Sequence, residues 1–239
     1  MAVAVLMCDQ DLHALTQVCH RMTIIACPIF LARQGLSPSS TSPSSLTIRG
    51  KAFSGLGVWL RWRRSSAFVP VHTVYCWFNP LWNDAVRELN CLHKAFSSLP
   101  TEPTFTNMYL YRVPILPGKE LNFLQTALQA ECSKLCIEAH TSILSPPNFA
   151  MKKYHPSAAY SIHLKELELR YQGLSTAAWC KFMTSIMIPS VRKLVIQGEV
   201  EMNVMQNFLL RHSNVASLQL TSTSKTPIYH EAIQSNIPS

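Results

Sequence analysis

Charged residues and glycine are both scarce in this chain of 239 residues. Charged side chains make up 14% of the sequence and apolar ones 48%, whereas an ordinary globular domain carries about 25% charge. This balance excludes intrinsic disorder, which requires low hydrophobicity and high charge. Only seven glycines occur, although loops that cradle phosphates or dinucleotides depend on glycine. The nearest approach, Gly55-Leu56-Gly57, lacks the third glycine of a dinucleotide fingerprint, so we expect no cofactor.

The motifs of metal sites and of common enzymes are missing as well. The eight cysteines form no Cys-x-x-Cys pair, and no Cys and His stand at zinc-finger spacing, so we expect no bound metal. There is no Gly-x-Ser-x-Gly elbow, and after His230-Glu231 the second histidine position of a zinc protease holds Gln234. The sequence therefore predicts a protein that is not an enzyme and has no small-molecule ligand.

Long apolar runs are also absent. The run Met22–Ala32 is apolar but contains Pro28, and it is far shorter than the roughly 20 residues of a membrane-spanning helix. The apolar start Ala2–Met7 is too short for a signal peptide. Most cysteines lie in apolar runs, as buried free thiols do. We therefore expect no transmembrane segment and a reducing, intracellular location in the cytoplasm or the nucleus.

Positive charge is concentrated near the N-terminus. The net charge is +8, and residues 1–64 contribute +5 of it, with seven Lys or Arg against two Asp. Residues 49–64 contain a dense cluster of aromatic and basic side chains, namely Trp59, Arg61, Trp62, Arg63 and Arg64. Such side chains can hold phosphates and stack on bases, or lie on an anionic membrane surface. The other interpretation is an amphipathic helix whose tryptophans pack inward while its arginines face water.

A short apolar pattern recurs along most of the chain. Its form is apolar-x-x-apolar-x-apolar, and consecutive copies lie 24 to 34 residues apart. The copies are Val71-Val74-Cys76, Phe105-Met108-Leu110, Cys132-Leu135-Ile137, Leu164-Leu167-Leu169, Val191-Leu194-Ile196 and Val215-Leu218-Leu220. The last two apolar residues of each copy alternate with other residues, which indicates a short strand. Helical patterns fill the gaps at 84–99, 121–128, 175–186 and 202–209.

This alternation predicts an α/β fold, a leucine-rich-repeat-like solenoid of parallel short strands and helices over residues 46–225. An ordinary layered α/β protein also alternates strands and helices, but its doubly covered strands would be almost wholly apolar. Before the repeats, residues 37–45 consist only of Ser, Thr and Pro and predict a linker. That leaves a short helical unit at 1–36 and a C-terminal tail at 226–239.

The N-terminal unit contains the motif Asp11-Leu12-x-Ala14-Leu15-x-x-Val18-Cys19-x-Arg21-Met22. The helical spacing of Leu12, Leu15, Val18 and Met22 predicts one packed face. The motif resembles the second half of an F-box, and segments 26–33 and 174–198 are similar to fungal, basidiomycete-type F-box-like proteins with degenerate leucine-rich repeats. The F-box-like residues by this resemblance are Leu12, Leu15, Val18, Cys19, Met22 and Pro28.

The resemblance implies a substrate receptor of an SCF-type ubiquitin ligase. Its partners would be a protein substrate and the ligase adaptor subunit. An F-box opens with a Leu-Pro-x-Glu-type helix that supplies much of the grip on the adaptor, and residues 1–10 contain neither Pro nor Glu. By this comparison the first half of the F-box is missing or replaced.

In each predicted strand, the side chains that alternate with the inward apolar pair must point to the opposite sheet face. The candidate protein-binding residues on that face are Tyr109, Tyr111, Glu168, Arg170 and Gln197. Aromatic and arginine side chains are common interface anchors, so we predict a non-enzymatic protein-recognition module. The alternatives are a face that is only solvated or is covered by residues 141–160 or the tail. The alternative function is nucleic-acid or anionic-membrane binding through residues 49–64.

Overall fold

The computed structural model describes residues 7–36, 45–65, 72–96, 105–114, 127–128, 132–140, 159–172 and 176–221. The strands are β1 (Ser45–Arg49), β2 (Thr73–Trp77), β3 (Asn107–Pro114), β4 (Lys134–His140), β5 (Ala159–Tyr160), β6 (Glu166–Gln172), β7 (Ile186–Met187), β8 (Lys193–Gln197) and β9 (Ser217–Thr221). The helices are α2 (Asp9–Leu15), α3 (His20–Arg33), α4 (Ala52–Ser65), α5 (Trp82–Phe96), α7 (Thr176–Ser185) and α8 (Met202–Arg211).

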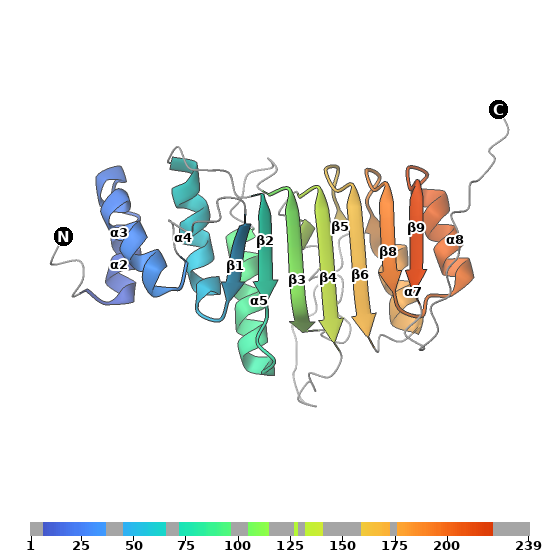
Figure 1. Ribbon diagram of the computed structural model, residues 1–239, viewed down its shortest axis with the longest axis horizontal. Coiled ribbons are helices and arrows are strands. Elements are labelled where there is room, and N and C mark those ends of the chain that lie inside the picture. Colours follow the sequence, from blue (N-terminus) through green and yellow to red (C-terminus); the bar gives the residue numbers. More distant parts are fainter. Residues whose placement is uncertain are drawn as a thin grey trace.

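Seven strands form one parallel sheet in the order β1-β2-β3-β4-β6-β8-β9, which is also their order along the chain. Figure 1 shows α5, α7 and α8 on one side of this sheet, with α4 and the α2–α3 pair toward the β1 end. The predicted α/β class is confirmed. The predicted adjacency of parallel strands is confirmed too, including that of Leu167 and Leu194 in β6 and β8.

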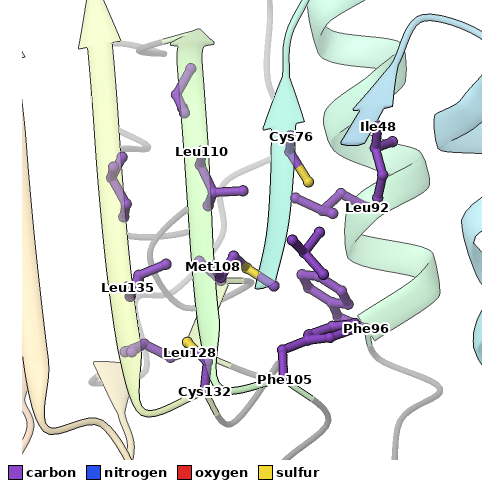
Figure 2. Close-up of a cluster of buried hydrophobic side chains, with 14 of the residues drawn as sticks. Ile48, Cys76, Leu92, Phe96, Phe105, Met108, Leu110, Leu128, Cys132 and Leu135 are labelled. Carbon is purple, nitrogen blue, oxygen red and sulfur yellow. The ribbon is translucent and has the colours of Figure 1, made fainter. Parts of the chain in front are cut away.

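Two ladders of apolar side chains cross the sheet on its helix side. One ladder contains Leu46, Val74, Met108, Leu135, Leu167, Leu194 and Leu218, and the other contains Ile48, Cys76, Leu110, Ile137, Leu169, Ile196 and Leu220. All are buried except the two members in β9, which are partly buried. In Figure 2, Leu92 of α5 points toward Ile48 and Cys76, and Phe96 lies beside Phe105. Each strand therefore shares its core with the strands beside it.

One hydrogen-bond arrangement repeats at the start of successive strands. The His72 carbonyl accepts from the backbone N–H groups of Thr106 and Asn107, at 2.9 and 2.8 Å. The carbonyls of Thr106, Ser133, Lys165 and Arg192 each accept two consecutive N–H groups of the following unit in the same way. Because each acceptor belongs to one unit and both donors belong to the next, this arrangement fixes successive units in one register.

The end of α8 is bonded to the end of α7. Arg211 donates from Nη2 to the Met183 carbonyl at 2.7 Å and from Nη1 to the Thr184 carbonyl at 2.9 Å. These two carbonyls lie in the last turn of α7, where the carbonyl groups of a helix have no backbone N–H partner within the helix. A guanidinium also suits the negative end of the helix dipole. The C-terminus of α7 is therefore stabilised by the unit that follows it.

Protonation of His212 is expected to weaken the fold at mildly acidic pH. The ring is buried, its Nδ1 donates to the Phe208 carbonyl at 2.8 Å, and its Nε2 accepts from the Ile188 N–H at 3.0 Å. This pair of contacts requires the neutral ring. Burial lowers the pKa of His212 below its usual value, and the charge of Arg211 lowers it further.

Because the unfolded state then holds this proton more tightly than the folded state, the free energy of unfolding should decrease as the pH falls below about 6.5. Above that pH the His212 contribution is constant. Urea denaturation across about pH 5 to 8 measures the slope. We expect His212→Gln to reduce the change in the free energy of unfolding with pH. An equal pH dependence in that variant would contradict the role assigned to His212.

The N-terminal unit departs from its predicted packing. The predicted stripe of Leu12, Leu15, Val18 and Met22 assumes one helix, but α2 ends at Leu15 and α3 is a separate helix. Leu12 is buried and Leu15 partly so, whereas Val18 is 67% and Met22 is 41% exposed. The chain turns between the helices and reaches an extended Cys19 (φ −161°, ψ 164°), which rotates the later residues off the stripe. The prediction is therefore wrong for Val18 and Met22.

The α3 helix packs on α4, so the N-terminal unit adjoins the layer of helices. Leu36, just after α3, is buried. The Ser54 hydroxyl donates to Gln34 Oε1 at 2.8 Å, and Gln34 Nε2 donates to Asp9 Oδ2 at 3.0 Å. One glutamine side chain therefore joins α2 to α4.

Three predicted segments fall largely outside the described residues. They are the linker at 37–45, the helix at 121–128 and the tail at 226–239. Ser45 is the exception within the linker, because it pairs with Thr73 as the first residue of β1.

Candidate interaction surface

The sheet face opposite α5, α7 and α8 carries three rows of side chains, and we call it the outer face. The rows follow the register of the parallel strands, which shifts between β3 and β4 after Leu110. The first contains Ser45, Thr73, Asn107, Lys134, Glu166, Lys193 and Ser217. The second contains Thr47, Tyr75, Tyr109, Cys136, Glu168, Val195 and Gln219. The third contains Arg49, Trp77, Tyr111, Glu138, Arg170, Gln197 and Thr221.

Four aromatic rings gather where β2 and β3 meet on this face. Tyr75 stacks on Tyr109 with ring centroids 5.0 Å apart, and Trp77 stacks on Tyr111 at 4.3 Å. The ring planes of these pairs differ by only 20° and 24°. Neighbouring strands lie about 4.8 Å apart, so paired residues in register place their rings at stacking distance. All four rings are half-buried, and we call them the aromatic cluster.

Among the described residues, three cations adjoin the aromatic cluster. The Arg49 guanidinium lies 4.8 Å and the Arg112 guanidinium 6.0 Å from the centre of the Trp77 ring. The Lys134 ammonium lies 5.8 Å from the centre of the Tyr109 ring. Cations at these distances are attracted by the ring electrons, which holds their long side chains near the rings.

Arg112 reaches Trp77 because the backbone is irregular at that point. Its φ is +57°, in the left-handed region that residues with a Cβ rarely adopt. The register between β3 and β4 shifts between Leu110 and Val113, so Arg112 lies within a local irregularity of the ladder. Irregularities of this kind redirect a side chain, and here the guanidinium comes to lie beside the indole ring.

The middle strands of the outer face carry ion pairs instead of rings. Arg170 Nε donates to Glu168 Oε1 at 2.7 Å, and Arg170 Nη1 lies 3.8 Å from Glu138 Oε2. Glu166 Oε2 lies 3.4 Å from Lys134 Nζ and 3.9 Å from Lys193 Nζ. These side chains are partly exposed, so each pair contributes little to stability. Their alternating charge instead gives the face a pattern that a partner can match.

Cys136 and Tyr111 stay neutral on this face at physiological pH. Burial raises the pKa of the Cys136 thiol to about 12, and the charge of Glu168 adds to the effect. A thiol of that kind is neither a nucleophile nor a metal ligand. Burial also raises the pKa of Tyr111, so its hydroxyl remains available as a hydrogen-bond donor.

The five predicted protein-binding residues all lie on the outer face, but in two groups. Tyr109 and Tyr111 belong to the aromatic cluster, whereas Glu168, Arg170 and Gln197 belong to the ionic middle of the sheet. The sequence reasoning did not select Tyr75 and Trp77. Their signal was the alternation in Thr73–Trp77, where two apolar residues point inward between three that point outward. Residues 141–158 and the tail, which were considered as covers for this face, lie outside the described residues.

The F-box-like residues have mixed environments. Leu12 is buried, Leu15 and Pro28 are half-buried, and Cys19 is exposed. Pro28 lies inside α3, which continues through it. Among the described residues of this unit, the large apolar side chains that are exposed are Val18, Met22, Ile24 and Ile25. The unit therefore presents apolar side chains both to α4 and to solvent.

In the basic segment, Trp59 is not available to a ligand. It is only 6% exposed and stacks on Phe105 with ring centroids 6.4 Å apart. This corrects the assignment of Trp59 to a binding surface and agrees with the alternative in which it packs inward. Arg61, Trp62, Arg63 and Arg64 lie on α4, and their side chains are outside what the structure describes.

Neither a metal centre nor a membrane span is found in the described part of the chain. No group of three His, Cys, Asp or Glu side chains there is placed to hold a metal ion. The helices in those residues are too short or too polar to cross a bilayer. Comparison of the chain with protein-family models, with curated proteins and with solved structures finds no match in any of the three.

Proposed function

We propose that this chain is a non-enzymatic protein-recognition module that binds a protein partner on the outer face of its sheet. The observation that carries the proposal is the aromatic cluster, in which two neighbouring strands hold four half-buried rings in register with three cations around them. Tyr, Trp and Arg are the side chains that dominate binding energy at protein interfaces. Rings already ordered by stacking also lose little conformational freedom when a partner binds.

The architecture that we propose for this module is a leucine-rich-repeat-like solenoid. It is supported by a strand order that follows the chain order, by the two apolar ladders, and by the shared-carbonyl arrangement that recurs from one unit to the next. In a solenoid each unit contacts mainly its neighbours, which creates an extended surface for a partner.

For the α2–α3 pair we propose attachment to the adaptor subunit of an SCF-type ubiquitin ligase, with the solenoid as substrate receptor. Neighbouring exposed apolar side chains on one element mark an interaction site. On α3, Met22, Ile24 and Ile25 are 41%, 54% and 42% exposed. The F-box-like motif suggests the adaptor as the covering protein. This assignment would locate the protein in the cytoplasm or the nucleus.

Affinity purification of the tagged full chain from its native cell tests the ligase assignment. We expect the adaptor and cullin subunits to be recovered with the wild type. Ile25→Glu should remove them, because it would place a charge in an apolar contact. Lys51→Glu, at an exposed position outside α2 and α3, is the control and should leave them bound. Recovery of other partners without any ligase subunit would contradict the ligase assignment alone.

Replacing Tyr111 and Arg170 together by alanine is expected to remove binding of a partner identified in this way. Truncating a central aromatic or arginine anchor typically costs about 2 kcal/mol or more, which corresponds to a roughly 30-fold loss of affinity for each. Calorimetric titration of the purified partner measures the loss, and circular dichroism verifies that the variant is folded. Wild-type affinity in this variant, with loss only when Arg61, Arg63 and Arg64 become alanine, would move the site to the basic segment.

The alternative function is binding of nucleic acid or an anionic membrane surface through residues 49–64. It predicts a steep fall in affinity with salt, because contacts to phosphates release counterions. A protein interface centred on aromatic rings should lose far less affinity as the salt concentration rises. A salt titration of the wild-type complex therefore separates the two functions.

A further inference from the structure

Positive charge on the outer face is unbalanced at the end formed by β1, β2 and β3. The exposed Arg49 and Arg112 side chains both lie within 6.0 Å of the Trp77 ring centre. Within the residues that the structure describes, neither forms an ion pair with a carboxylate. The carboxylates of this face lie farther along the sheet, on β4 and β6, where they pair with lysines and with an arginine. This end of the face therefore attracts anions.

The position of Arg112 is maintained against two unfavourable terms. Its left-handed backbone conformation is costly for a residue with a Cβ, and its charge is held at the same ring as that of Arg49, which it repels. Backbone strain of this kind persists mainly at binding and catalytic sites. An anion that contacts both guanidinium groups would offset this repulsion.

The stacking of the rings indicates which anion fits. β1 and β3 lie on opposite sides of β2, so Arg49 and Tyr111 approach the Trp77 ring from opposite faces. A nucleobase needs a free ring face on which to stack, and both faces of this indole are occupied. The groups left for a ligand are the edges of the rings and the two planar guanidinium groups, which match the geometry of a carboxylate.

We propose that the β1–β3 end of the outer face is a subsite for the carboxylate of an Asp or Glu in an extended peptide segment of the partner, bound between Arg49 and Arg112 beside Trp77. This inference rests on the proposed function and specifies the partner's chemistry, namely an acidic segment. The neighbouring rings Tyr75 and Tyr109 then contact the residues that follow the acid. A second acidic residue is disfavoured farther along, where Glu138 and Glu168 would repel it.

The test selects peptides from a random dodecapeptide library displayed on phage, with the immobilised full chain as bait. We expect the selected peptides to be enriched in Asp or Glu next to an apolar or aromatic residue. A selected peptide is then synthesised with a fluorescent label, and its affinity is measured by anisotropy. Changing its acidic residue to the corresponding amide should weaken binding about tenfold or more, since hydrogen bonds to charged groups are the strong ones.

Three variants of the chain locate the subsite. Arg49→Gln should weaken binding of the acidic peptide about tenfold and leave its amide version unaffected. Arg112→Gly should do the same, and because glycine accepts a φ of +57° without strain, this variant should be at least as stable as the wild type. Arg87→Gln removes the same charge from the exposed side of α5 and should leave the affinity unchanged.

The outcomes separate the inference from the proposed function. Selected peptides that need Tyr109 and Tyr111 but show no acidic preference would overturn the subsite and leave the recognition function standing. Equal loss of affinity in Arg87→Gln and Arg49→Gln would also overturn it, because only net charge would matter. Binding of an oligothymidylate that competes with the peptide and is lost in Arg112→Gly would assign this end to nucleic acid. Failure to enrich any peptide that binds this face would overturn the subsite, whereas the recognition function is tested separately by recovery of a partner from the cell.

Discussion

Gly198→Ala is expected to destabilise the protein by about 3 kcal/mol, near the upper end of the usual cost of overpacking. A Cβ at this position would lie 2.7 to 2.9 Å from three atoms of the Trp179 indole, closer than van der Waals contact allows. Trp179 is fully buried and packs edge-on against Tyr171 with ring centroids 5.3 Å apart. Because the core encloses the indole, we expect that either β8 or α7 must shift to relieve the contact.

Gly57→Ala provides the matched control in the same chain. Gly57 lies inside α4, and the nearest atom to an added Cβ is the Cβ of Ala95 at an ordinary 4.0 Å. Alanine inside a helix is favoured over glycine by roughly 0.5–1 kcal/mol, so this variant should be more stable than the wild type. Urea denaturation measures both variants. Equal effects at Gly198 and Gly57 would show that the indole contact does not constrain the fold.

A second substitution tests the stated cause of the Gly198 effect. In Trp179→Phe the smaller ring leaves room for the added methyl group. The cost of Gly198→Ala should then be smaller than in the wild-type background, which a double-mutant cycle measures as a coupling energy. If the two changes in the free energy of unfolding are simply additive, the cost of Gly198→Ala arises from the backbone of residue 198 and not from the indole contact.

The sheet was largely predictable from the sequence, because its determinant is local and periodic. Each strand carries inward apolar residues at positions two apart, and in a parallel sheet of consecutive units that spacing alone places Leu167 beside Leu194. The outer face follows from the same alternation, so Tyr109, Tyr111 and Arg170 were placed correctly. No side-chain contact had to be known in advance for either result.

Features that depend on a change in chain direction were not predictable in this way. The break between α2 and α3 leaves the helical spacing of Leu12, Leu15, Val18 and Met22 intact in the sequence, yet it exposes the last two. The left-handed Arg112 is similar, because no glycine or asparagine marks the irregularity in β3. The periodic pattern of the sequence continues unchanged through such a point, although the backbone changes direction there.

The arrangement of Arg49, Trp77 and Arg112 shows why this limit matters for function. Strand register alone brings Arg49 to Trp77 and Trp77 to Tyr111. The second guanidinium reaches Trp77 only through the irregular backbone, and the proposed carboxylate subsite depends on it. Periodicity therefore accounts for which residues lie on the outer face, whereas the position of Arg112 depends on the departure from that periodicity.

Leu194→Ala and Leu167→Ala are each expected to lower the free energy of unfolding by about 2–5 kcal/mol, through lost burial and the cavity left behind. Both side chains are at most 1% exposed and face each other across β6 and β8. The effect should also be cooperative along the sheet, because each residue completes the core of the unit on either side.

Leu220→Ala is the matched control for these two changes. Leu220 lies in β9 at the end of the other apolar ladder and is only partly buried, so its truncation removes less contact and leaves no closed cavity. We expect a loss of about 1 kcal/mol, because less apolar surface leaves the core. Chemical denaturation of the three variants provides the comparison. A loss below about 1 kcal/mol at Leu194 or Leu167 would mean that the residue is solvated. A loss at Leu220 as large as theirs would mean that further residues cover β9 and continue the core past the last strand of the sheet.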